Sequence, residues 1–185
     1  MADRLLGALS GAAARLYGGE AVSELEHALQ CADLARDAGA DEELELACLL
    51  HDVGRWAADP SLISDRADVA RVRGTVPHSI LGAELIAPWV PARVTWCVRM
   101  HADAKRYLCA TDPAYYDRLS PASRHTLGLQ GGLMSAAVVA ALSGHPWLTD
   151  ALRLRRWDDE AKVPGKSTRA LTDWAPLLRR YFARP

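Results

Sequence analysis

The apolar residues of this chain repeat with the period of an α-helix, and histidine and aspartate interrupt them. In residues 46–53, leucine and valine recur at i, i+3, i+4 and i+7, which places them on one face of a helix. The adjacent pair His51-Asp52 lies in the same stretch, where a buried carboxylate is costly unless it is paired or bound to a metal ion. No segment shows the alternation of a strand over a useful length. The sequence therefore predicts an all-α fold, a helical bundle with a polar site in its core.

Capping residues and helix breakers divide the chain into separate helices. Asp41 can cap a helix that we expect to end at Gly54, Pro77 stands near the start of another, and Ser120-Pro121 begins a third. The predicted helices span residues 22–38, 41–54, 75–86, 93–100, 120–129, 134–142, 147–157 and 172–182. Between them we expect an irregular excursion over 57–76, a loop over 107–119 and a surface loop over 158–169. The length of 185 residues, without internal repeats, fits a single domain over 1–185.

Charge and composition exclude several classes of function. A net charge of −1 gives no electrostatic basis for binding nucleic acid or a membrane surface. No apolar run approaches the roughly 20 residues of a membrane span, and the first residues lack a signal pattern, so we expect a cytoplasmic protein. Four scattered cysteines favour buried free thiols over a disulfide framework. The oligomeric state is left open.

Four of the six histidines and two aspartates provide the ligand types that a transition metal prefers. His27 and His101 each lie on the apolar stripe of a predicted helix, and either one alone is more typical of a hydrogen-bonded core residue. Imidazole and carboxylate together suit iron, manganese or zinc, whereas calcium and magnesium prefer oxygen donors almost alone. The candidate ligands are His27, His51, Asp52, His78, His101 and Asp158.

The order of these residues resembles the HD-domain family from His27 to Asp158. That resemblance implies a dinuclear site in the core of the bundle. One ion would be held by His27, His51, Asp52 and Asp158, and a second by Asp52, His78 and His101. His125 and His145 fall outside the pattern and are expected at the surface or behind the ligands. HD-domain enzymes with such sites are either phosphohydrolases or di-iron oxygenases, and the ligands alone do not separate the two chemistries.

Residues that could bind an oxyanion follow the candidate ligands. Lys105 is one helical turn after His101, and Arg155 is three residues before Asp158, so each shares a helical face with a ligand. A guanidinium can grip an oxyanion through two hydrogen bonds. The helix that begins at Ser120-Pro121 adds a polar stripe near its N-terminus, a natural place for a phosphate or phosphonate. This stripe consists of Ser123, Thr126 and Gln130.

Longer sequence strings narrow the resemblance to the PhnZ-like phosphonate oxygenases. These strings are ELEHALQCA (24–32), HADAKRYL (101–108), LSPASRHTLGLQGG (119–132) and RRWD (155–158). The resemblance implies two iron ions, one Fe(II) and one Fe(III). It also implies cleavage by O2 of the carbon–phosphorus bond of a 1-hydroxy-2-aminoethylphosphonate, or of its N-methylated analogue, with release of phosphate.

The same resemblance assigns roles around the metal ions. The candidate catalytic residues are Tyr17, Glu20 and Lys105. Tyr17 would occupy the open iron position until substrate displaces it, and Glu20 would help to bind the amino end of the substrate. Lys105, Ser123, Thr126, Gln130 and Arg155 would bind the phosphonate. Arg55 is a departure, because the best-known member of the family has a histidine there. A larger, permanently charged side chain could clamp the phosphonate harder or indicate a different substrate.

Two alternatives remain open at this point. A metal-dependent phosphohydrolase acting on a nucleotide or phosphomonoester would use the same metal ligands and cations without redox-active iron or oxygen. A helical binding module with a purely structural metal site would bind metal and turn over nothing. The oxygenase is the leading hypothesis because the strings around Lys105, Ser123 and Arg155 are more specific than the HD pattern.

Overall fold

The computed structural model describes residues 1–56 and 76–183. Within these residues the chain forms helices and contains no strand, apart from an isolated bridge between Leu16 and Ser23. The prediction of an all-α fold is therefore confirmed. The elements are α1 (Ala2–Gly11), the 3-10 helix η1 (Ala12–Ala14), α2 (Glu24–Asp37), α3 (Glu42–Leu50), α4 (Val53–Trp56), α6 (His78–Ile86), α7 (Ala92–Thr111), α8 (Pro113–Arg118), α9 (Pro121–Leu129), α10 (Ala136–Ser143), α11 (Leu148–Glu160) and α12 (Leu171–Phe182).

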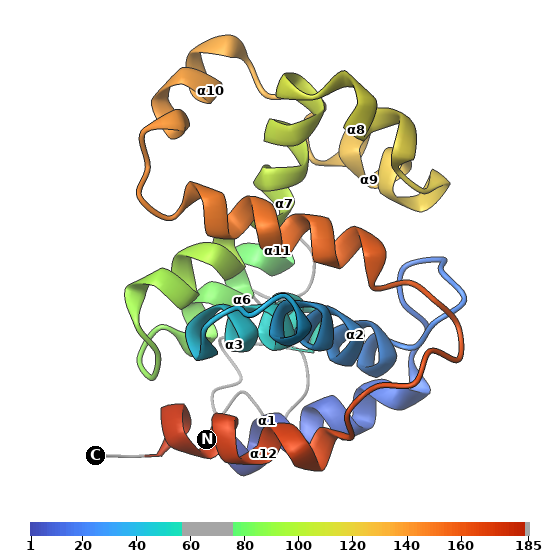
Figure 1. The fold of residues 1–185 in the computed structure, drawn as a ribbon, viewed down its shortest axis with the longest axis vertical. Coiled ribbons are helices and arrows are strands. Elements are labelled where there is room, and N and C mark those ends of the chain that lie inside the picture. Colours follow the sequence, from blue (N-terminus) through green and yellow to red (C-terminus); the bar gives the residue numbers. More distant parts are fainter. Residues whose placement is uncertain (57–75, 184–185) are drawn as a thin grey trace.

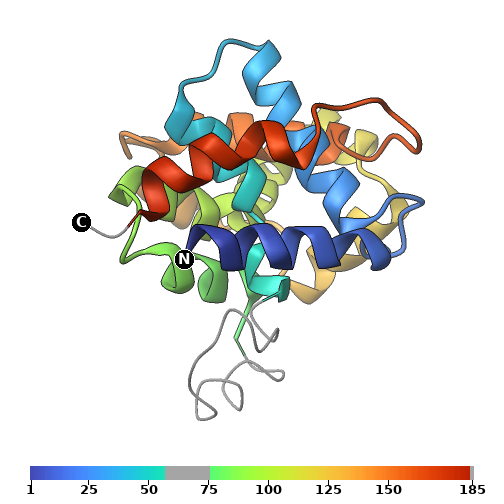
Figure 2. The same ribbon diagram turned by 90° about the horizontal axis from the view of Figure 1, so that it is seen from below.

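The helices stack in tiers around α7 and α11, which cross at the centre of the molecule (Figure 1). Helices α2, α3 and α6 lie beneath this crossing, and α8, α9 and α10 lie above it (Figure 1). Helices α1 and α12 run side by side and close the lower face (Figure 2). The main core lies between these tiers, where Trp56, Trp174 and Phe182 are among the largest fully buried side chains. The metal-ligand candidates come from the central tiers.

Side-chain caps begin several of the helices. Ser23 and Glu26 form a capping box at the start of α2, with the Ser23 hydroxyl accepting from the Glu26 amide and the Glu26 carboxylate accepting from the Ser23 amide. Asp41 caps α3 by accepting from the Leu44 amide at 3.0 Å. Ser120 caps α9 ahead of Pro121. The predicted starts at Asp41 and Ser120 are confirmed, whereas the cap at Ser23 was not predicted.

The predicted loop over 107–119 is wrong. Helix α7 continues to Thr111, and α8 follows almost at once. Pro113 begins α8 instead of breaking a helix, because the first helical position needs no amide hydrogen and Asp112 caps the turn. Leu108 and Tyr115 are buried in a second, smaller apolar cluster, which stabilises a segment whose sequence alone looks irregular.

Two further differences concern helix ends, and a third is an additional helix. Gly54 does not end a helix but lies inside α4. Helix α11 extends to Glu160, three residues beyond the predicted end, so Asp158 is helical and the loop follows it. The N-terminal helix α1, which the sequence analysis did not predict, buries Leu5 and Leu9 in the core. The predicted excursion over 57–76 lies outside the described residues, except for residue 76.

Two expectations about composition can be compared with the fold. Cys31, Cys48, Cys97 and Cys109 are all buried free thiols, as predicted. None of the helices in residues 1–56 and 76–183 combines the length and apolar character needed to cross a membrane.

Candidate metal centre

Five elements bring the six candidate ligands together. His27 comes from α2, His78 from the first position of α6 and His101 from α7. Asp158 lies in the last turn of α11, and His51 and Asp52 occupy the short connection between α3 and α4. All of them are buried except His78, whose side chain is 26% exposed. Residues up to 131 positions apart in the sequence therefore lie together in one buried site.

The ligand atoms fall into two groups, each compact enough to surround one metal ion. In the first, His27 Nε2 lies 3.0 Å from His51 Nε2 and 3.3 Å from Asp158 Oδ1. In the second, His78 Nε2 lies 3.1 Å from His101 Nε2 and 3.0 Å from an oxygen of Asp52. The second group contains the residues that the family resemblance assigned to one ion, and the first contains those assigned to the other except Asp52.

Asp52 stands between the two groups. Its Oδ1 is 3.0 Å from His78 Nε2, while its Oδ2 is 3.4 Å from His51 Nε2 and 3.9 Å from His27 Nε2. Both oxygens are buried, and neither has a hydrogen-bond partner within the described part of the chain. Native proteins rarely leave buried polar atoms unpaired, so this carboxylate is arranged to receive cations on both sides. Asp52 would therefore contribute an oxygen to each group if both groups held a metal ion.

Backbone carbonyls fix the histidines in the tautomer that a metal requires. The Nδ1 atoms of His27, His51 and His101 lie 2.7, 2.8 and 2.7 Å from the carbonyl oxygens of Ala161, Cys48 and Val98. A proton on Nδ1 leaves the lone pair of Nε2 free, and each Nε2 points into a ligand group. Burial lowers the pKa of His101 to about 4, which keeps this imidazole neutral. The donor set therefore fits two transition-metal ions of the iron, manganese or zinc type.

The other two histidines lie away from the centre. His125 is exposed on α9. His145 stacks against Trp96, with ring centroids 3.9 Å apart and an interplanar angle of 4°. Neither belongs to a ligand group, in agreement with the sequence pattern.

A cavity of about 210 Å³ opens directly beside the second ligand group and Asp158. Every residue that the sequence analysis proposed for substrate binding lines it. Lys105 Nζ donates to Thr126 Oγ1 at 2.8 Å and to the Ser123 carbonyl at 3.3 Å. Gln130 contributes an amide oxygen that is buried and lacks a hydrogen-bond partner among residues 1–56 and 76–183. The helices α7 and α9 thus place cationic and polar groups beside the metal ligands.

Arg155 links the cavity to the metal ligands. Its Nη1 donates to Asp158 Oδ2 at 2.6 Å, its Nε donates to the Tyr115 hydroxyl oxygen at 3.1 Å, and the guanidinium also pairs with Asp159. Although burial opposes ionisation, Arg155 and His27 hold the pKa of Asp158 well below its usual range. Arg156 is exposed instead, so Arg155 is the arginine of this pair that faces the cavity.

Lys162 also lines the cavity, and the sequence analysis did not identify it. Its Nζ donates to Ser123 Oγ at 2.9 Å and lies 3.5 Å from Asp159 Oδ1 and 4.0 Å from Glu20 Oε1. The residue follows α11 in a segment without helical periodicity, so no pattern placed it on a particular face. Its only signal in the sequence was a position four residues after Asp158.

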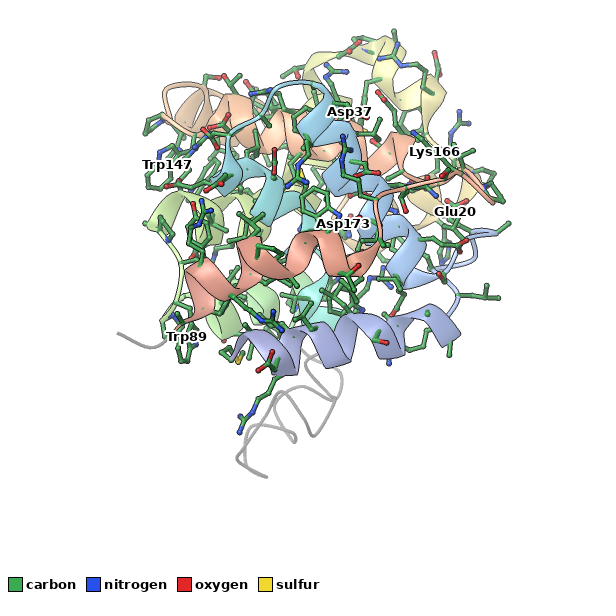
Figure 3. The ribbon with its side chains drawn as sticks, turned by 60° about the horizontal axis from the view of Figure 1, so that its bottom comes forward. Glu20, Asp37, Trp89, Trp147, Lys166 and Asp173 are labelled. Atoms are coloured by element: carbon green, nitrogen blue, oxygen red, sulfur yellow. The ribbon has the colours of Figure 1, made fainter. Side chains whose placement is uncertain are left out.

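The loop between η1 and α2 carries Tyr17 and Glu20 to the cavity. Gly18 and Gly19 have φ values of 46° and 87°, which favour glycine and allow the tight turn closed by the Glu20 amide donating to the Tyr17 carbonyl. The Tyr17 ring stacks on His27 with centroids 3.8 Å apart, and its hydroxyl donates to Asp158 Oδ1 at 3.4 Å. Glu20, labelled in Figure 3 near the edge of the molecule, accepts from Ser120 Oγ at 2.6 Å.

Arg55 lies in α4, three residues after Asp52. Its Nε is 3.2 Å from Asp52 Oδ1, and its guanidinium carbon is 5.0 Å from the centroid of the Tyr17 ring. The side chain lines the cavity and is 29% exposed. Arg55 therefore contributes a permanent positive charge close to the metal ligands.

The chain is similar to a known family and to several known proteins. The family model of the HD domain matches residues 25–128. A relative from Leisingera caerulea, described as a (1-hydroxy-2-(trimethylamino)ethyl)phosphonate dioxygenase that forms glycine betaine, is 39% identical over 164 residues, covering 89% of this chain and 81% of the relative. A hydroxymethylphosphonate dioxygenase from Gimesia maris is 40% identical over 146 residues, covering 79% of this chain and 71% of the relative. An uncharacterized protein of Acanthamoeba polyphaga mimivirus is 31% identical over 170 residues, covering 90% and 75%.

Proposed function

The chain belongs to the HD-domain family and, within it, to the family of the phosphonate dioxygenases, and from this we propose that it cleaves the carbon–phosphorus bond of a 1-hydroxyphosphonate with O2. The observation that carries the proposal is the cavity that joins a two-metal ligand set to a cluster of cations. The two relatives are named for different substrates, but both substrates are phosphonates with a hydroxyl group on the carbon next to phosphorus. We therefore take this 1-hydroxyphosphonate unit as the common element.

We infer that the centre holds two iron ions, one Fe(II) and one Fe(III). His27, His51, Asp52 and Asp158 would hold one ion, and Asp52, His78 and His101 the other. When bound, this pair supplies the redox chemistry with O2 that the protein side chains lack. The support for the inference is the nitrogen-rich donor set and the buried Asp52 carboxylate, whose oxygens have no hydrogen-bond partner among the described residues.

The protein side chains would bind and orient the phosphonate. Lys105, Arg155 and Lys162 provide positive charge, and Ser123, Thr126 and Gln130 provide polar groups on the same wall of the cavity. Such a wall would hold the phosphonate oxygens and fix the adjacent carbon beside the metal ligands. Tyr17 covers His27 and contacts Asp158, so it would leave this position when substrate enters. Glu20 would contact the end of the substrate that lies toward the loop.

The proposed reaction balances without a further co-reactant. For 2-amino-1-hydroxyethylphosphonate, one molecule of O2 is consumed and the products are glycine and phosphate. The carbon next to phosphorus loses its bonds to hydrogen and phosphorus and becomes a carboxylate carbon, while phosphorus gains an oxygen. Hydroxymethylphosphonate and the trimethylammonium analogue follow the same stoichiometry.

Simultaneous measurement of O2 uptake and phosphate release tests the proposal. Iron-loaded protein is given 2-amino-1-hydroxyethylphosphonate, its trimethylammonium analogue or hydroxymethylphosphonate. Consumption and release in a one-to-one ratio on any of the three supports the dioxygenase. Phosphate release without O2 uptake, or equal turnover under strict anaerobiosis with manganese, would instead establish the phosphohydrolase.

Phosphonate binding is expected to weaken as the pH rises above about 8. Burial, followed by the charge of Arg155, lowers the pKa of Lys105 to about 8. The protonated form binds the anion, so its contribution is present below this pKa and is lost as the pH rises through it. KM should therefore rise up to about tenfold per pH unit on the alkaline side, and Lys105→Arg, which stays charged, should flatten this rise. A wild-type KM that is constant to about pH 9.5 would contradict the role of Lys105.

A further inference from the structure

We propose that Arg55 makes this enzyme selective for 1-hydroxyphosphonates whose substituent on the hydroxyl-bearing carbon is uncharged or anionic, and that it disfavours substrates with an ammonium group there. The inference rests on the proposed function and narrows its substrate class. It assigns to Arg55 the role of a specificity-determining residue.

The charges that line the cavity are predominantly positive. Arg55, Lys105, Arg155 and Lys162 contribute four cations, against the carboxylates of Glu20 and Asp158. Asp158 is already paired with Arg155 at 2.6 Å. Two bound metal ions would add further positive charge. A cationic substituent on the substrate would therefore need a carboxylate that is still available.

Glu20, the carboxylate that the family resemblance assigns to an amino group, is already occupied. It accepts a hydrogen bond from Ser120 Oγ at 2.6 Å, and Lys162 Nζ lies 4.0 Å away. Lys162 in turn donates to Ser123, on the wall that would hold the phosphonate. Glu20 thus belongs to the hydrogen-bonded cluster at the phosphonate wall. Within that cluster the positive charge of Lys162 offsets the negative charge of Glu20.

Arg55 lies beside Tyr17 and Gly18, on the other side of the same loop sequence that carries Glu20, with its guanidinium carbon 5.0 Å from the centroid of the Tyr17 ring. A Cβ atom at Gly18 would meet Arg55 Nη2 at 3.8 Å. Among the described residues, Asp52 is its ion-pair partner, with Nε the nearest guanidinium nitrogen at 3.2 Å from Oδ1. With the phosphonate on the wall formed by Lys105 and Ser123, the remaining substituent would extend along the cavity toward this guanidinium. An uncharged group fits beside it, and a carboxylate would pair with it.

Among the described residues, the cavity offers a quaternary ammonium group little free aromatic surface. Such groups are bound by the faces of aromatic rings. Apart from the two histidine ligands, Tyr17 is the aromatic residue in the described lining. Its ring already stacks on His27 at 3.8 Å, and the Arg55 guanidinium lies 5.0 Å from the same centroid. A trimethylammonium group would have to displace a cation from the only ring available in that part of the structure.

Binding measurements on four phosphonates test this inference. Anaerobic calorimetry with metal-loaded protein would compare hydroxymethylphosphonate and hydroxy(phosphono)acetate with 2-amino-1-hydroxyethylphosphonate and its trimethylammonium analogue. Repulsion between like charges several ångströms apart in a partly solvated site predicts that the first two bind about tenfold or more tightly than the last two. Wild-type protein that binds either ammonium compound as tightly as hydroxymethylphosphonate would overturn the inference.

Substitutions at Arg55 separate charge from shape. Arg55→Gln should bind the carboxylate compound more weakly and both ammonium compounds more tightly than the wild type, so that the four affinities converge to within about threefold. Arg55→Lys keeps the positive charge and should keep the wild-type ranking of affinities. Arg156→Gln removes an exposed arginine of α11 and should leave the ranking unchanged. Ratios of affinity are compared because a change beside Asp52 that lowers metal content would weaken all four ligands together. An unchanged ranking in Arg55→Gln would show that Arg55 does not set specificity.

The two hypotheses fail in distinguishable ways. If none of the four compounds is cleaved with O2, the proposed function fails, although the ranking of affinities still tests Arg55. If the trimethylammonium compound is bound and cleaved best, the dioxygenase stands and the role of Arg55 is refuted.

Discussion

Asp52→Asn is expected to remove metal and to abolish turnover. Asp52 is the residue that faces both ligand groups, with Oδ1 toward His78 and Oδ2 toward His51. Asparagine keeps the size of the side chain but removes its charge and one oxygen donor. Loss of an outer partner of a metal ligand typically costs about 10–100-fold in metal affinity or activity. Loss of a carboxylate shared by two ions should cost more, on the order of a thousandfold in turnover.

Metal analysis and coupled O2 and phosphate assays measure this effect. Asp33→Asn provides a matched control, because Asp33 is also buried on a central helix but pairs with Arg169, outside the site. The control should retain wild-type metal content. Near-normal metal content and turnover in Asp52→Asn would show that Asp52 does not bridge two ions.

The sequence was informative about the metal centre because the chemistry of its ligands conflicts with their surroundings. A buried His51-Asp52 pair in an apolar helix is costly, and that cost is a signal that can be read without a structure. The capping residues Ser120 and Asp41 were informative for a similar reason, because a side-chain cap acts within three residues. Both kinds of signal are local.

Features that depend on tertiary packing could not be predicted from such local signals in the sequence. The segment around Tyr115 is helical because it packs into a small apolar cluster, which its own sequence does not reveal. Arg155 and Arg156 differ in burial only through the register of α11. Lys162 reaches the cavity from a segment without periodicity, through contacts with Ser123 and Asp159. Each of these depends on where another element lies.

Gly54 illustrates the same difference. A glycine near the end of an apolar stretch is typical of a helix C-terminus, and the sequence analysis interpreted it so. In the structure it lies within α4, where that helix crosses the start of α6. A Cβ atom at Gly54 would lie 1.9 Å from the His78 carbonyl oxygen and 2.7 Å from the Gly82 amide nitrogen. Close approach of two helix backbones, and not helix termination, therefore requires glycine here.

Gly54→Ala is accordingly expected to destabilise the fold and disturb the second metal site together. The atoms that the new methyl group would strike are backbone atoms, which cannot move aside as a flexible side chain can. Overpacking of this kind costs about 1–3 kcal/mol or more in the free energy of unfolding. The helix α6 would have to shift, and His78, whose own carbonyl is struck, would shift with it. Denaturant unfolding and metal analysis should show lower stability and a loss of metal.

Gly7→Ala separates this effect from the general consequences of replacing a helical glycine. Gly7 lies in α1, and a Cβ atom there would have no neighbour within 4 Å in the described structure. Alanine favours the helix over glycine by up to about 1 kcal/mol, so Gly7→Ala should be neutral or slightly stabilising and should keep its metal. Both substitutions replace glycine with alanine, but they are expected to change the free energy of unfolding in opposite directions. Wild-type stability and full metal content in Gly54→Ala would show that α4 and α6 do not hold Asp52 and His78 together through this contact.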